Sequence, residues 1–192
     1  MSILDKGYKE PSTANYMKFV EGVNIFRMLS DSIEGWEIWE EIQNEDGSTK
    51  RQPLRFRKDD EIPQEKVGFD KFGNSDLKFF WAFVVYNFTD ERIQILELTQ
   101  ATIRQGILAL IRNKKWGDPR DYNLAVTRID GEPVKYIVQA EPKEELPKEI
   151  LDKYKAMNIK LEKLYDGKDP FEKAKSKDEE VDLSDVPDKI PG

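Results

Sequence analysis

The sequence predicts a mainly β fold: a small barrel of five strands with a helix between strands 3 and 4, followed by a C-terminal helix and an acidic tail. Three observations support this prediction. Short segments rich in β-branched and aromatic residues dominate the first half of the chain, one stretch with helical periodicity follows, and two alternating segments come after it. The length of 192 residues suits one domain with appendages.

The segments before the helix have the patterns of strands. Gly22 interrupts the first of them, where a glycine is typical of a bulge. In the second, alternation places Trp36 on one face and Trp39 on the other, so we expect Trp39 to point outward. The longest apolar run should be a strand covered on both faces. The segments with these patterns are residues 16–29, 33–42, 54–57, 77–88 and 92–98.

A helix is expected over residues 99–113, because Ile103 and Ile107 recur at helical spacing. Two alternating segments, 121–129 and 134–140, then predict a hairpin. Strands, one helix and two further strands is the connectivity of the OB barrel, whose helix lies between strands 3 and 4. A β-sandwich with an inserted helix is the competing topology.

The C-terminal part predicts a second helix near 147–165, opened by Pro147, which either packs on the barrel or mediates self-association. After Phe171 too few apolar residues remain for folding, so we expect disorder. The predicted organisation is a flexible N-terminal arm (1–15), an OB-fold domain (16–142), a linker with the C-terminal helix (143–171) and a disordered acidic tail (172–192).

Composition removes most enzymatic chemistry. Cysteine and histidine are absent, which excludes disulfides, catalytic triads and nearly every zinc site, so we expect no cofactor, no metal and no enzyme activity. The sequence has no apolar window long enough for a membrane helix and no signal pattern, which predicts a cytoplasmic protein. Carboxylates that could hold a divalent cation for nuclease chemistry, outside any known motif, are Asp59, Asp60, Glu61, Asp90 and Glu91.

Charge is unevenly distributed along the chain. The net charge is −7, but residues 178–192 contain six acids and one lysine and account for −5 of it. Such a tail can occupy a DNA groove as a mimic or recruit basic partners, or it can simply aid solubility. The tail acids are Asp178, Glu179, Glu180, Asp182, Asp185 and Asp188. We expect deletion of residues 172–192 to tighten DNA binding.

Basic and aromatic residues gather in the strands and loops where an OB barrel binds nucleic acid. Alternation places Arg55 and Arg57 on one face, where they can line a groove while Phe56 packs inward, although the segment can also be an ordinary solvated loop. In the strand 77–88 we assign the Trp81 face to the core, and a register slip of one residue would exchange the faces.

The loop after the helix places two lysines beside Trp116, which either contacts DNA or forms a structural lid. Phe80 and Tyr86 are the stacking platforms expected on the strand 77–88. The candidate DNA-binding residues are Trp39, Lys50, Arg51, Arg55, Arg57, Lys58, Lys78, Phe80, Tyr86, Lys114, Lys115, Trp116 and Arg120.

Three long collinear stretches carry a family resemblance. YMKFVEGVNIFRMLSDSIEGWEIWE, FFWAFVVYNFTDERIQILELTQATI and NKKWGDPRDYNLAVTR resemble the OB-fold single-stranded DNA-binding proteins of tailed bacteriophages, over residues 16 to about 140. The resemblance implies a protein that coats and protects single strands during DNA replication, recombination and repair. It also implies an acidic tail that engages replication and recombination proteins and limits binding away from DNA.

The chain departs from that family in two respects. It has no Cys or His for the zinc ion of some phage relatives, and it ends in VPDKIPG rather than in an acidic run closed by phenylalanine. An RNA- or protein-binding OB module and a metal-dependent nuclease remain alternatives. A homo-oligomer is a further alternative that the sequence leaves open.

Overall fold

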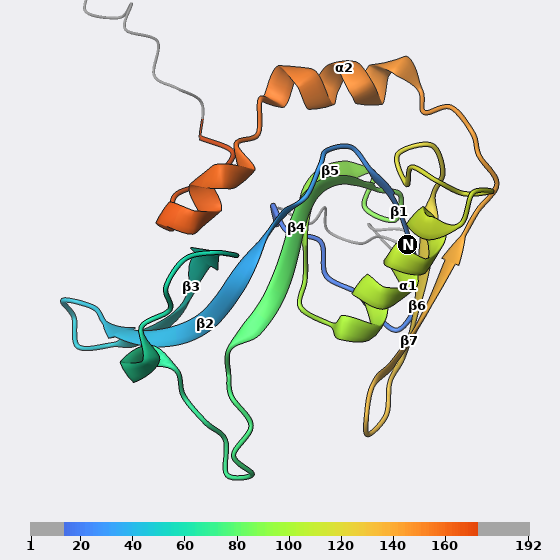
Figure 1. Ribbon diagram of the computed structural model, residues 1–192. Helices are drawn as coiled ribbons and strands as arrows, with labels where there is room; N and C mark the ends of the chain where they lie inside the picture. Colours follow the sequence, from blue (N-terminus) through green and yellow to red (C-terminus); the bar gives the residue numbers. More distant parts are fainter. Residues whose placement is uncertain (1–13, 173–192) are drawn as a thin grey trace, which may run out of the picture.

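The computed structural model describes residues 14–172, which form a mainly β fold around one antiparallel sheet of seven strands (Figure 1). The strands are β1 (Gly22–Met28), β2 (Ile33–Gln43), β3 (Thr49–Arg57), β4 (Lys78–Asn87), β5 (Arg92–Leu98), β6 (Leu124–Ile129) and β7 (Lys135–Ala140). The helices are α1 (Ala101–Arg112) and α2 (Lys148–Met157), and two 3₁₀ segments are η1 (Gln64–Lys66) and η2 (Leu161–Asp166). The mainly β class is confirmed, but the sheet has seven strands rather than five and is not closed.

Strand β4 lies at the centre of the sheet. One of its edges pairs with β2 and then with β1, and the other edge pairs with β5. β3 flanks β2, while β6 and then β7 extend the sheet beyond β1. The β2–β3 hairpin projects from the rest of the sheet, and we call it the wing (Figure 1). Without the wing, the chain order is three strands, α1 and two strands.

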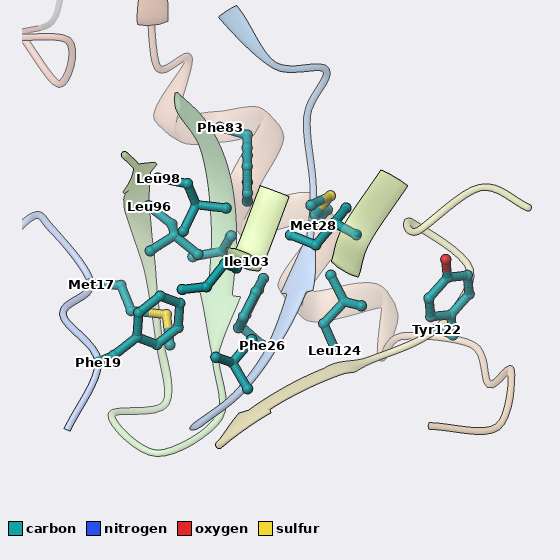
Figure 2. Packing of buried hydrophobic residues seen from close by; sticks show 13 residues of the cluster. Met17, Phe19, Phe26, Met28, Phe83, Leu96, Leu98, Ile103, Tyr122 and Leu124 are labelled. Atoms are coloured by element: carbon teal, nitrogen blue, oxygen red, sulfur yellow. The ribbon is translucent and has the colours of Figure 1, made fainter. Parts of the chain in front are cut away.

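The main core lies between the sheet and α1 (Figure 2). Ile103 and Ile107 of α1 are fully buried against Phe83, Leu96 and Leu98. Their helical spacing in the sequence produces this contact, because residues four apart lie on one side of a helix. We call this side of the sheet the α1 face.

Residues 14–19 run from β5 to β7 instead of extending β1. The Met17 N–H donates to the Ile95 carbonyl at 2.9 Å, and the Ile95 N–H donates to the Asn15 carbonyl at 2.9 Å. The Phe19 ring lies 6.0 Å from the Tyr136 ring on β7. The strand expected over 16–29 therefore begins only at Gly22, where φ of 94° breaks the extended backbone.

A second core covers the opposite side of β4 and β5, which we call the η2 face. Leu161 and Leu164 pack there with Phe80, Val84 and Ile95. The helix expected over 147–165 is interrupted, because α2 ends at Met157 and Asn158 adopts a left-handed conformation with φ of 47°. The chain then turns so that η2 meets the sheet.

Candidate nucleic-acid interface

Strand register decides which aromatic side chains of the wing share a face. Trp36 pairs with Phe56 on β3 and with Phe79 on β4, so all three rings lie on the α1 face. Glu37 and Trp39 point to the η2 face. Trp39 is 44% exposed there, which confirms that it points outward.

Most of the residues expected to bind DNA lie on the η2 face, but its centre is not open. Phe80 has no exposed surface and lies under η2, with the Tyr165 ring 6.3 Å away. The expectation that Phe80 is an accessible stacking platform is therefore wrong. Tyr86 is half-buried in the same cluster and makes an edge contact with Phe88 at 5.0 Å.

Arg55 does not line an open groove, which corrects a second expectation. Its side chain is only 9% exposed and its guanidinium is held between two carboxylates, 3.1 Å from Glu37 and 2.7 Å from Glu97. Trp39 Nε1 donates to Glu37 at 2.9 Å. Burial, followed by the neighbouring Glu37, raises the pKa of Glu97 to about 8.

The sequence contained one signal of this cluster. Glu97 alternates with Ile93 and Ile95, which places an acid on an apolar face of β5. A carboxylate in that position needs a cation or a proton, and Arg55 is the cation that the β3 register brings to it.

Arg57 and Lys58 are exposed but occupied by ion pairs. Arg57 contacts Glu162 at 2.8 Å and stacks on the Tyr165 ring, with 4.3 Å between guanidinium carbon and ring centroid. Lys58 pairs with Glu34 at 3.1 Å. Arg57 thus holds η2 on the sheet, and it would have to release η2 to meet a phosphate.

The exposed cations on the wing and on β4 have fewer contacts. Arg51 lies over the Trp39 ring at 5.8 Å on the η2 face. Lys50 faces the other way, because it pairs with Ile42, and Lys78 is exposed at the start of β4. These residues form the open border of the wing.

The loop after α1 combines open lysines with a packed indole. Lys114 and Lys115 are exposed, whereas Trp116 is half-buried against Tyr122, with 5.4 Å between ring centroids. Of the two alternatives for Trp116, the packing favours the structural lid. Arg120 is bound to Asp118 at 2.7 Å and to Asp31 at 3.0 Å.

The α1 face carries an aromatic row that the sequence analysis did not select. Phe56, Trp36 and Phe79 lie side by side across β3, β2 and β4, each half-buried, and the Trp36 and Phe79 rings meet edge to face at 5.0 Å. Trp81 continues the row along β4. Alternation in the sequence places Trp36 on the face opposite to Trp39. In the structure this face of the wing is only partly covered, so the Trp36 ring is half-buried.

The row ends at a hollow of about 530 Å³ between β4, α1 and the loop at 117–120. Trp81, Leu108 and Ile111 supply its apolar wall, and Glu34, Asp31 and Arg120 supply polar groups. Ile111 is 41% exposed, so this apolar wall is open to solvent. A flat group with a polar edge, such as a nucleobase, suits this lining.

Comparisons with protein-family models, curated proteins and solved structures found no match to the chain. Within residues 14–172, no helix has the length and apolar character needed to cross a membrane. The tail acids from Asp178 to Asp188, and most of the N-terminal arm, lie outside the described residues.

Proposed function

We propose that this chain is a non-enzymatic, sequence-independent single-stranded DNA-binding protein with an OB-type body. The chain order of three strands, a helix and two strands around the α1 core matches OB connectivity once the wing is treated as an insertion after β1. The gap between β5 and β7, which residues 14–19 span, takes the place of the barrel's closing seam.

The observation that carries the proposal is the aromatic row on the α1 face, Phe56, Trp36, Phe79 and Trp81, leading into the 530 Å³ hollow. Bases stack on such rings with about 1–3 kcal/mol each, whatever their sequence. Lys50 and Lys58 lie on the same side of the wing, and Arg120 lines the hollow. These cations can contact the phosphates of a single strand whose bases stack on the row.

A second path is carried by the η2 face, where Trp39, Arg51 and Lys78 are exposed. This path is shorter, because Phe80 is covered and Arg55 is neutralised by carboxylates. We therefore place the strand on the α1 face. The acidic tail competes with DNA for the cations and recruits replication and recombination proteins.

Two tryptophans three positions apart on β2 separate the two paths. Trp36→Leu should weaken binding of fluorescein-labelled oligo-dT by about 5- to 150-fold, the equivalent of one lost stacking contact, while Trp39→Leu should change it less than about 2-fold. Anisotropy titrations at low salt measure both. If Trp39→Leu weakens binding more than Trp36→Leu does, the DNA strand lies on the η2 face instead.

A comparison of three nucleic acids tests which class of ligand the protein binds. Wild-type protein should bind poly-dT more tightly than duplex DNA or single-stranded RNA, and the affinity should fall as salt rises. A preference for RNA would indicate an RNA-binding OB module. No binding to any of the three at low salt would refute the proposed function.

A further inference from the structure

A second hollow of about 680 Å³ lies beyond Arg120, the residue that lines both hollows. Its wall is formed by the linker and by Lys148 and Leu151 of α2. Lys143 supplies a second lysine, and the carboxylates in the lining are Asp121, Glu144 and Glu145. Its floor is Arg27 of β1. The two hollows therefore lie on either side of one exposed arginine.

Arg27 places a buried positive charge, without an ion-pair partner in the part of the chain that the structure describes, at the floor of this hollow. Arg27 is only 1% exposed. Its guanidinium nevertheless donates only to uncharged acceptors, which are Asn123 Oδ1 at 2.8 Å and the carbonyls of Arg120 and Glu144 at 3.0 Å each. Among residues 14–172, no carboxylate lies within ion-pair distance of it. Burial lowers the pKa of Arg27, and the nearby carboxylates Glu144 and Asp121 only oppose that effect.

These hydrogen bonds also fix the rim of the hollow, by which we mean the residues around Arg27 that line it. Arg27 holds the backbone of Arg120 on one side of the hollow and that of Glu144 on the other. The Asn123 amide donates to Glu144 Oε1 at 2.9 Å, so one rim carboxylate is already bonded. The lysines at 143 and 148 have no ion pair among the described residues.

We propose that this second hollow binds the phosphates of single-stranded DNA, as a continuation of the path over the aromatic row. The inference rests on the proposed function and extends it across Arg120. A strand leaving the row passes Arg120, and its backbone then meets Lys143 and Lys148 above the buried Arg27. The surface pairs of Arg120 with Asp118 and Asp31 cost little to exchange for a phosphate, because exposed ion pairs contribute about 0–1 kcal/mol.

The test uses two pairs of lysines with equal charge. The double variant Lys143→Ala/Lys148→Ala removes the rim, and Lys153→Ala/Lys155→Ala removes two lysines that do not line the hollow, both on α2. Arg27 is left unchanged because it holds the linker. Oligo-dT of graded length is titrated into the full-length chain over a range of salt concentrations.

The rim variant should lower the slope of log K against log salt by about 1.4, since each single-strand phosphate contact contributes about 0.7. This loss should occur with long oligonucleotides and disappear with those too short to pass Arg120. The control pair should keep the wild-type slope. If the two double variants give the same slope of log K against log salt, lowered or not, the second hollow is not a phosphate site.

Two results distinguish loss of the second hollow as a site from loss of the proposed function. If wild-type protein binds oligo-dT and Trp36→Leu weakens it, the row is occupied whatever the lysines do. If wild-type protein binds no oligonucleotide of any length, the proposed function falls and the second hollow falls with it.

Discussion

A single buried cluster joins the wing to the body of the protein. Arg55 of β3 bridges Glu37 of β2 and Glu97 of β5, whose side chains are 3% and 17% exposed. One guanidinium cannot neutralise two buried carboxylates, and the raised pKa of Glu97 means that this group keeps its proton at neutral pH. The cluster therefore holds one positive and one negative charge.

Loss of that proton should make stability depend on pH. The folded-state pKa of Glu97, about 8, lies above the unfolded value of about 4.3, so the folded state binds more protons between these limits. This contribution to the free energy of unfolding is complete below about pH 4.3 and is lost as pH rises through 8. The slope is at most about 1.4 kcal/mol per pH unit.

Glu97→Gln should flatten the decline, because a neutral amide has no proton to lose. Urea denaturation between pH 6 and 9.5 measures the effect. Glu162→Gln, which changes an exposed carboxylate, is the control and should leave the slope as in wild type. A wild-type slope in Glu97→Gln would show that another group titrates.

Alternation in the sequence predicted which side chains share a face, but not which faces stay open. It grouped Phe80 with Tyr86 and Arg55 with Arg57, and the structure keeps both groupings. Both faces of β4 are apolar, so nothing local to the strand shows that η2 covers Phe80. Coverage is a property of segments distant in sequence, here Leu161 and Leu164.

At the scale of elements, α1 and β7 approach each other closely at Gly106. A Cβ atom there would lie 2.8 Å from Val138 Cβ and 2.9 Å from its Cγ2. A glycine that weakens the helix by about 1 kcal/mol thus permits the packing of α1 on β7.

Gly106→Ala should therefore destabilise the protein despite its better helix propensity. Overpacking costs typically 1–3 kcal/mol against a gain of about 1, so we expect a net loss of about 1 kcal/mol in thermal or chemical denaturation. In a Val138→Gly background the loss should shrink, because both the Cβ and the Cγ2 contacts are gone. A stabilised single variant would contradict the close approach.

The order of elements was largely predictable, and their assembly was less so. The expected helix at 99–113 and the hairpin near 121–140 lie where α1, β6 and β7 are found. The helix expected over 147–165 is longer than α2, because its apolar stripe continues through Leu161 and Leu164 while the backbone turns at Asn158. Spacing records burial and does not reveal a change of direction.

At the scale of the whole molecule, the last described segment of the chain is fixed on one face of the sheet. Tyr165 donates to the Glu34 carbonyl at 2.6 Å, and Arg57 holds Glu162, so η2 is fixed on the η2 face. The DNA path that we propose lies on the opposite side, over the half-buried aromatic row and the first hollow. We propose that the acidic residues after 172 compete with DNA for the cations of that path through their charge.

Removal of residues 178–192 should consequently tighten binding to oligo-dT at low salt, because it deletes a net charge of −5. This cut keeps Glu172, which lies 3.4 Å from Lys163, and so leaves the described residues intact. The gain should fade toward 0.5 M salt, where the Debye length of a few ångströms screens the tail from the cations. A full-length variant with the six tail acids changed to amides should behave like the truncation, and wild-type affinity in both at low salt would exclude competition by the tail.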